Sequence, residues 1–304
     1  MLHTTALRGK TFIKMILETF LKYLLILWLM APHPIGAVQT ERPDAHFKSL
    51  EGRLIQDGFD PGFIQEIFKN QDVFLEVRGV SLFFMHQEST LNYDQFKESS
   101  ALDKARIYMQ TYRDPLEAAE KAYGVPPQVV TAILLVETRL GSYTGNRLVL
   151  NSLSTMAAMS DEAVRNIIWQ SIPKERRPTR EQFDKKADQR TQWAYDQLKA
   201  FLSYSRREDM DPVQIRGSYA GALGVAQFIP TSIMAYARDG NNDGRVDLFD
   251  HADAIASIAN FLRHYGWREN IGPEDAYKVI FNYNRSSYYV NTVLEIAKKL
   301  EGSS

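Results

Sequence analysis

Apolar residues recur along most of this chain at spacings of three and four positions, the period of a helix that buries one face. No long stretch alternates apolar with polar residues, as the strands of a large sheet do. The pattern therefore predicts a mainly α fold, or α+β with minor β. The apolar stretch at 73–84 suits a strand or a helix equally. Helices are expected over residues 61–70, 101–112, 115–123, 126–141, 253–266 and 286–300.

The first 37 residues have the three-part layout of a secretory signal. Arg8, Lys10 and Lys14 precede an apolar stretch at 23–30, and two small residues follow at positions 36 and 37. The apolar stretch is much shorter than the roughly 20 residues that a spanning helix needs. We therefore expect cleavage and export to the periplasm, with an uncleaved signal anchor as the alternative.

Composition bounds the possible functions. With 304 residues, of which 44% are apolar, the chain can form one or two domains. It has no cysteine, which excludes disulfides, a thiol nucleophile, a cysteine-ligated zinc and a lipoprotein anchor. Residues 1–37 hold four basic and one acidic residue, so the remainder carries 32 basic and 36 acidic side chains, a net charge of −4. No nucleic-acid partner is expected, because such proteins carry a basic surplus.

One carboxylate lies among apolar positions of the predicted helix at 126–141. Two prolines suit the first turn of this helix and a glycine suits its end. Glu137 follows apolar residues by three, four and seven positions, so it points to the buried side. Burial raises a carboxyl pKa and keeps the proton, as a general acid requires. The alternative is a buried ion pair, although Arg139 points elsewhere on the helix.

A glycine-rich segment at 217–232 carries Ser218 and Gln227 in an otherwise apolar run. Glycines let the backbone approach a ligand closely, and a glutamine side chain can donate and accept hydrogen bonds. Binding of an acetamido sugar and tight packing of small residues are equally good interpretations. The segment lacks the lysine pattern of a phosphate-binding loop.

The segment DGNNDGRVDLFD at 239–250 has the oxygen-ligand spacing of an EF-hand loop. An Asp at the closing position reaches less far than the usual Glu, and a metal-free polar turn is the alternative. No second hand is evident, so we expect a structural calcium clamp and not a sensor. The predicted ligands are Asp239, Asn241, Asp243, the carbonyl oxygen of Arg245, and Asp250, with Asp247 acting through water.

Two further stretches differ in character. The segment at 160–210 is rich in charge and predicts a solvated insertion. The segment at 281–300 interleaves tyrosines with amides, including Asn284 and Tyr289, ahead of a final helix that a serine at 286 or 287 can cap. Aromatic faces stack on sugars and amides bind hydroxyl groups, so one or two of these side chains are expected to line a site.

Four motifs in this order resemble the lytic murein transglycosylase B family: VETRLG, GSYAGALGVAQFIP, DGNNDGRVDLFD and YNRSSYYV. The resemblance covers about residues 105–300. It implies a lysozyme-like helical catalytic domain there, with the charged insertion at about 160–210 inside it. Residues 38–104 are expected from their own pattern to form a mostly helical N-terminal region. The resemblance also implies a bound calcium or sodium ion and no organic cofactor. Leu140 departs from the family, where an aromatic residue often follows Glu-Thr-Arg.

The resemblance assigns roles to single residues. Glu137 corresponds to the catalytic glutamate, and saccharide binding corresponds to Ser218, Gln227, Asn284 and Tyr289. The implied reaction cleaves the MurNAc–GlcNAc β-1,4 bond of peptidoglycan and forms 1,6-anhydroMurNAc. A hydrolytic muramidase and a catalytically silent, calcium-stabilised glycan-binding protein are the alternatives. The expected partners are glycan strands and complexes of cell-wall enzymes, and the chain is expected to be a monomer.

Overall fold

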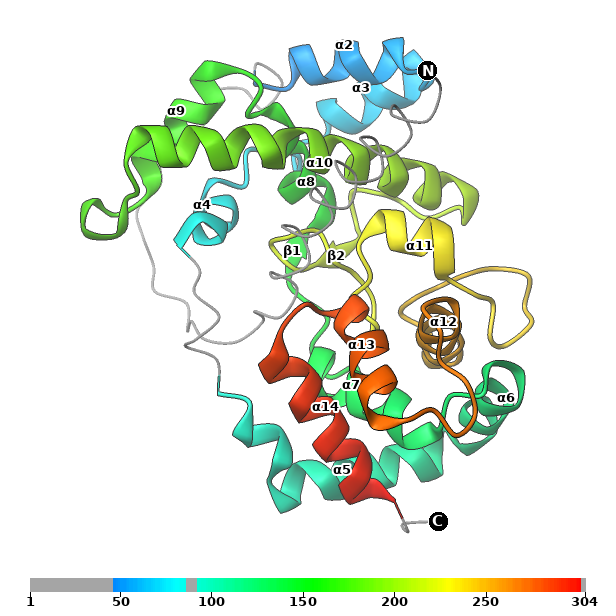
Figure 1. Cartoon of the computed structure of the whole chain (residues 1–304). Helices are drawn as coiled ribbons and strands as arrows, with labels where there is room; N and C mark the ends of the chain where they lie inside the picture. Colours follow the sequence, from blue (N-terminus) through cyan, green and yellow to red (C-terminus); the bar gives the residue numbers. More distant parts are fainter. Residues whose placement is uncertain (1–45, 86–91, 302–304) are drawn as a thin grey trace, which may run out of the picture.

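The computed structural model describes residues 46–85 and 92–301. They form a mainly helical protein with one small sheet, as the apolar spacing predicts (Figure 1). The predicted signal lies outside the described residues. None of the helices described is both long enough and apolar enough to span a membrane. Ahead of the sheet, the helices are α2 (Lys48–Gln56), α3 (Pro61–Lys69), α4 (Val77–Met85), η4 (Asp94–Lys97), α5 (Ser99–Thr111), α6 (Arg113–Tyr123) and α7 (Pro127–Thr138).

The remaining elements build the second part of the chain. Strands β1 (Arg147–Leu148) and β2 (Arg216–Gly217) form the sheet. The helices are α8 (Val149–Ala158), α9 (Glu162–Ser171), η5 (Lys174–Arg176), α10 (Arg180–Arg207), α11 (Pro230–Tyr236), α12 (His251–His264), α13 (Pro273–Tyr283) and α14 (Ser287–Leu300).

The long helix α10 organises one half of the molecule. It packs along α8 and α11, while α4 packs against α8 and α9 (Figure 1). A capping box at Thr179 and Gln182 begins α10. This helix contains much of the charge at 160–210, but Phe183 and Ala187 are fully buried, so its polar sequence still covers an apolar face.

Helix α7 lies at the centre of the other half. It contacts α14, α5 and α6, and every residue from Val129 to Thr138 is buried. A helix that is apolar all round belongs in a core. The predicted boundary at residue 104 falls inside α5, which packs on α7 and α14.

The sheet joins residues that lie far apart in the sequence, and the position and pairing of its strands were not predicted. Arg147 pairs with Gly217, and Leu148 pairs with Arg216, in antiparallel register. A Cβ on Gly217 would lie 2.2 Å from the carbonyl oxygen of Ala222, so only glycine fits this close approach. The pairing places the glycine-rich segment beside the chain that leaves α7.

Three boundaries differ from the sequence predictions. The ambiguous stretch at 73–84 becomes helical only from Val77, because the Glu76 side chain accepts the N–H of Gly79 at 2.9 Å and caps α4. Helix α12 begins at His251, two residues before the predicted start, since Asp250 caps it. Helix α7 ends at Thr138, three residues before the predicted glycine stop.

The early end of α7 has a backbone cause. Arg139, Leu140 and Gly141 are consecutive left-handed residues, with φ of 51°, 62° and 84°. The N–H of Leu140 reaches back to the carbonyl oxygen of Leu134 at 3.0 Å, which satisfies one of the carbonyl groups at the end of the helix. Two non-glycine residues in this region carry strain, and such strain is typical of functional sites.

Candidate active site

Glu137 lies in the last turn of α7 with only 4% of its surface exposed. Burial raises the pKa of its carboxyl group to about 8, and a hydrogen bond from Tyr289 opposes that rise. The Tyr289 hydroxyl donates to Glu137 Oε1 at 2.9 Å. Glu137 Oε2 is buried and has no hydrogen-bond partner among the described residues. The group is therefore a neutral acid at pH 7 with one oxygen available to a ligand.

Glu137 does not form the ion pair that was the alternative. Arg139 adopts a left-handed conformation and directs its guanidinium away, where Nη2 donates to Gln95 Oε1 at 2.6 Å. The Arg139 guanidinium therefore does not neutralise Glu137, and burial is the main influence on the carboxyl pKa of Glu137.

Two tyrosines flank the acid. Tyr283 at the end of α13 and Tyr289 in the first turn of α14 are stacked, with ring centroids 6.4 Å apart and planes within 3°. The Tyr283 hydroxyl donates to the carbonyl oxygen of Ala226 at 2.5 Å. Burial, more than the charge of Glu137, raises the pKa of both phenols well above the usual value. Both therefore remain hydrogen-bond donors.

The glycine-rich segment holds Gln227 in a strained conformation with φ of 49°. Its Nε2 donates to the carbonyl oxygens of Gly224 at 2.8 Å and Thr144 at 3.0 Å. Both amide hydrogens are thereby used, and the buried Oε1 has no partner among the described residues. Sequence reasoning allowed this amide to donate and accept, whereas the fold leaves it only an acceptor role toward a ligand.

Ser218 is buried in the same segment, where its side chain stabilises the local turn of the backbone. Its Oγ accepts the N–H groups of Ala220 at 3.2 Å and Ala222 at 3.0 Å. The hydroxyl hydrogen stays available to donate. Among the described residues, no hydrogen bond joins Ser218 to Glu137. The direct contact seen between Tyr289 and Glu137 therefore has no counterpart at Ser218.

Asn284 follows α13 and is 1% exposed, with its Oδ1 buried and unpartnered among the described residues. Three of the predicted site residues, Glu137, Gln227 and Asn284, therefore each have a buried oxygen without a hydrogen bond. Such atoms are rare in folded proteins because each one costs free energy. A ligand rich in O–H and N–H groups would satisfy them.

A short chain of hydrogen bonds connects the acid helix to the predicted metal loop. Thr138 Oγ1 donates to the carbonyl oxygen of Val225 at 2.9 Å. The N–H of Val225 in turn donates to the carbonyl oxygen of Leu248 at 2.7 Å. The loop at 239–250 is thus two hydrogen bonds away from the residue that follows Glu137.

The loop at 239–250 has the backbone of a tight turn. Asp239 accepts the N–H groups of Asp243 and Gly244, and Gly244 has a φ of 86°. Asn241 Oδ1 accepts the N–H of Asp243, and Asp243 Oδ1 accepts that of Arg245. The three predicted ligands at loop positions one, three and five are therefore held in one tight turn, and their oxygens retain further lone pairs.

The closing position is arranged differently. Asp250 Oδ1 accepts the N–H groups of Ala252 and Asp253 at the start of α12. Asp253 ties the two ends of the loop together, since it accepts the N–H groups of Gly240 and Asp247. Within the described residues no three acidic or histidine side chains cluster closely enough to hold a metal. The oxygen donors and the tight turn suit calcium, but the acidic side chains of the loop are not close enough together to share one ion.

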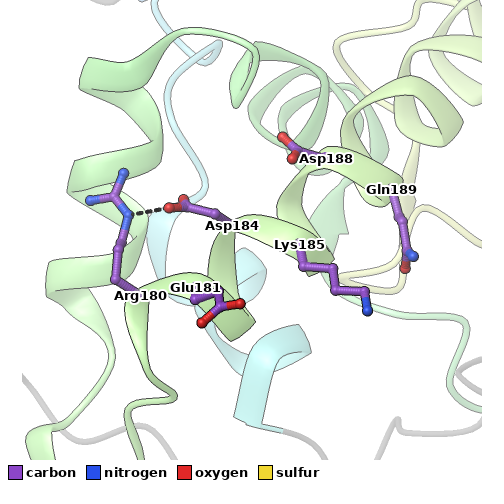
Figure 2. Close-up of a pocket in the computed structure, with 6 residues that line it drawn as sticks. All are labelled: Arg180, Glu181, Asp184, Lys185, Asp188 and Gln189. Carbon is purple, nitrogen blue, oxygen red and sulfur yellow. Dashed lines mark hydrogen bonds and ion pairs between the residues drawn. The ribbon is translucent and has the colours of Figure 1, made fainter.

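Two surface hollows lie away from these residues. One is lined by charged and polar side chains of α10, among them Arg180 and Asp184, which form a hydrogen bond (Figure 2). The other lies between residues 57–59 and the end of α10. Neither includes a buried acid, so we place the candidate site at Glu137 on chemical grounds.

Sequence reasoning missed Thr138 and Tyr283 as parts of this site. Tyr283 is one of the tyrosines in the segment at 281–300, and a separation of six along the chain gives no local sign that its ring stacks on Tyr289. Thr138 follows the acid directly, but its partner Val225 is 87 residues away. No local pattern indicates a contact of that range.

Comparison with known proteins shows which family the chain is similar to. The family model for the transglycosylase SLT domain matches residues 43–274. Membrane-bound lytic murein transglycosylase B of Escherichia coli is 33% identical over 161 residues, which are 53% of this chain and 37% of that protein. The match thus spans well under half the length of that relative.

Solved structures share the fold at lower identity. Soluble lytic transglycosylase SltB1 of Pseudomonas aeruginosa has a TM-score of 0.68 at 22% identity, over 83% of this chain and 97% of that one. Escherichia coli SLT35 in complex with calcium has a TM-score of 0.67 at 22% identity, over 84% and 92%. SltB3 of Pseudomonas aeruginosa in complex with NAG-anhNAM-pentapeptide has a TM-score of 0.67 at 20% identity, over 86% and 80%. The lysozyme-like transglycosylase fold is therefore confirmed.

Proposed function

Because this chain belongs to the family of transglycosylase SLT domains, we propose that it cleaves the MurNAc–GlcNAc β-1,4 bond of peptidoglycan and leaves a 1,6-anhydroMurNAc end. The observation that carries the proposal is the buried Glu137 carboxyl group, whose pKa is about 8 and whose Oε2 has no partner among the described residues. A group of this kind holds a proton at pH 7 and can release it to a glycosidic oxygen.

A single acid favours the intramolecular reaction. Glycosidases of the usual kind need a second carboxylate beside the first. The other buried carboxylates that the structure describes are engaged: Glu76 pairs with Arg147, Glu208 with Arg207, and Asp253 accepts two backbone N–H groups. The attacking group is therefore assigned to the substrate.

The proposed sequence of steps uses Glu137 twice. Its Oε2 protonates the oxygen that leaves C1 of MurNAc, while the 2-acetamido group of that sugar stabilises the developing positive charge. The resulting carboxylate then takes the proton from the C6 hydroxyl as this oxygen attacks C1. The attacking oxygen is already tethered to the reacting sugar, so no entropy is lost in bringing it there, and no water is consumed.

The surrounding residues would hold the sugar. Gln227 Oε1 and Asn284 Oδ1 accept hydrogen bonds from hydroxyl or acetamido N–H groups, and Ser218 donates one. Tyr289 keeps Glu137 in one orientation and, after proton transfer, stabilises the carboxylate. SltB3, a relative of the same fold, has been seen with a muropeptide fragment.

The proposed metal is calcium, with sodium as the alternative ion. Asp239, Asn241, Asp243, the Arg245 carbonyl oxygen and Asp250 would hold it, and it would stabilise the loop without taking part in bond cleavage. A relative of the same fold is known in complex with calcium. Export through residues 1–37, a monomeric state and association with cell-wall enzymes stay predictions from the sequence.

Digestion of purified murein tests the activity. The wild-type chain should release anhydro-muropeptides, which are lighter by one water than hydrolytic products and are separable by mass spectrometry. Glu137→Gln should release at least about 1,000-fold less, because a general acid that also acts as the base contributes in both roles. Glu120→Gln, an exposed substitution on α6, serves as the matched control.

Two outcomes would favour the rival functions. Products that carry the extra water would indicate a hydrolytic muramidase. Equal product release by Glu137→Gln would remove this residue from the mechanism, and binding of murein without any release by the wild type would indicate a silent glycan-binding protein.

A further inference from the structure

Arg285 differs from the other arginines in its surroundings. It is partly buried, and its Nε is fully buried without a hydrogen-bond partner among the described residues. The other buried or partly buried arginines in the described part of the chain each contact a carboxylate, a carbonyl or amide oxygen, or an aromatic ring. They are Arg53, Arg106, Arg139, Arg147, Arg165, Arg177, Arg180 and Arg190.

The position of Arg285 ties it to the candidate site. It occupies the short connection between α13 and α14, where Asn284 on one side is buried and Ser286 on the other caps α14. Tyr283 and Tyr289 flank the same connection, and both belong to the surroundings of Glu137. The guanidinium is therefore carried by the same short connection as Asn284, one of the residues proposed to bind the sugar.

Two tyrosines complete the surroundings of Arg285. Its charge lies close enough to Tyr265 to oppose the rise in pKa that burial causes there. The Tyr265 hydroxyl lies 3.0 Å from that of Tyr236, at the ends of α12 and α11. Both rings are partly exposed, and His264 packs against them with centroids 5.1 and 4.9 Å away. These three rings form an aromatic cluster, and its member Tyr265 lies within the influence of the Arg285 charge.

A partly buried cation without a partner costs folding free energy, and a bound anion would repay that cost. A guanidinium matches a carboxylate with two parallel hydrogen bonds. The sugars of the proposed substrate offer neutral hydroxyl and acetamido groups, whereas the peptide stems on MurNAc offer carboxylates. We propose that Arg285, beside Tyr236 and Tyr265, binds a carboxylate of the peptide stem and makes the chain prefer stem-bearing glycan. The identity of the polymer rests on the proposed function.

A binding comparison separates this proposal from the proposed function. Glu137→Gln, which leaves the strands uncut, is titrated with soluble glycan strands that keep their stems and with chitin oligosaccharides of similar length, which offer only hydroxyl and acetamido groups. The double variant Glu137→Gln/Arg285→Gln should bind stem-bearing strands about tenfold more weakly or worse. Its affinity for the chitin oligosaccharides should stay within about twofold. Arg285→Lys in the same background keeps the positive charge but cannot form the two parallel hydrogen bonds. Its affinity for stem-bearing strands should lie between those of the parent and the Arg285→Gln variant.

Folding and specificity are controlled in the same series. Arg78→Gln, which removes an exposed positive charge on α4, should change neither affinity. Arg285→Gln should melt at the same temperature as the parent or higher, since it removes an unpaired charge; a clear drop would indicate a structural role and overturn the proposal.

Equal weakening on both kinds of glycan, or no weakening on either, would also overturn stem recognition. If the wild-type chain releases no anhydro-muropeptide, the proposed activity is wrong. The binding comparison would still decide the role of Arg285 in that case.

Discussion

The proton on Glu137 depends on two opposed influences at the scale of single residues. Burial in α7 raises the carboxyl pKa, and the hydrogen bond from Tyr289 favours the ionised form. Burial is the larger effect, so the side chain is neutral below pH 8. Both influences can be removed one at a time by near-isosteric substitutions.

Glu137→Gln should stabilise the fold at pH 8 more than at pH 5. The carboxyl group has a pKa of about 8 when folded and about 4.3 when unfolded. Between these values the folded state holds a proton that the unfolded state has lost, so wild-type stability falls as the pH rises. The glutamine variant escapes this loss, which amounts to about 3 kcal/mol at pH 7. Melting curves from pH 4 to 9 measure it, and a pH-independent difference would contradict the assigned pKa.

Tyr289→Phe should move the alkaline limb of kcat/KM to higher pH. The lost hydroxyl bond favours the ionised form of Glu137, so the pKa of the acid rises without it. The rate below the limb should fall about tenfold or more, because the carboxylate formed during the reaction loses its donor. Rates of anhydro-product release across pH test this. Tyr288→Phe, which changes an exposed neighbour, should leave the limb in place.

At the scale of elements, the site depends on how α7 is fastened to the glycine-rich segment. Thr138 donates to the carbonyl oxygen of Val225 and accepts the N–H of Gly141 at 2.9 Å. It therefore fixes the end of the acid helix, the left-handed residues after it and the segment that carries Gln227. A second threonine on the same helix, Thr131, is buried with no hydrogen-bond partner for its hydroxyl among the described residues.

Thr138→Val should lower the free energy of unfolding by about 1–3 kcal/mol, since it leaves buried main-chain groups unpaired. Thr131→Val makes the same chemical change on the same helix and should be neutral or stabilising. Urea unfolding of both variants measures the difference. Equal effects would mean that the bond between Thr138 and Val225 contributes nothing.

Calcium should raise the melting temperature with little change in the far-ultraviolet circular dichroism. At a concentration 100 times the dissociation constant, binding stabilises by about 2.7 kcal/mol. Asp243→Asn should abolish this response, because it removes a ligand charge from the loop. Asp114→Asn, an exposed substitution on α6, should keep the response. A large conformational change on adding calcium would instead indicate a sensor.

Local rules predicted the elements better than their contacts. The prolines before α7, Gly266 after α12 and Ser286 before α14 all act where the sequence placed them, since capping involves neighbours along the chain. The two-residue strands escaped prediction because their pairing depends on residues 70 apart. An even larger separation of 152 residues hid the contact between Glu137 and Tyr289, although each had been named from its motif.

The whole molecule joins its N-terminal segment to the site-bearing half through polar contacts. Glu76 pairs with Arg147 of β1 at 2.5 Å, and its N–H donates to Thr155 of α8 at 2.8 Å. Asn151 of α8 donates to the carbonyl oxygen of Asp72 at 2.8 Å. The segment at 72–79 therefore supports the strand that pairs with Gly217, and the two halves should unfold together.

Glu76→Gln should lower the free energy of unfolding by about 2 kcal/mol, because it leaves the Arg147 charge partly buried and unpaired. The transition should stay single and its denaturant slope unchanged, as expected for one cooperative unit. Glu66→Gln, an exposed substitution on α3, is the matched control. Two separate transitions would show that the N-terminal helices fold independently.

Val225 connects the loop at 239–250 to helix α7 only through its own backbone N–H and carbonyl groups. Its amide hydrogen faces Leu248 and its carbonyl oxygen faces Thr138. Two successive peptide planes therefore join the loop at 239–250 to the end of α7. Side-chain replacement at this position cannot cut the connection, apart from proline, which has no amide hydrogen to give. Replacement of Val225 by another apolar residue of similar size, which this buried position can accommodate, should therefore leave the coupling between the two regions intact.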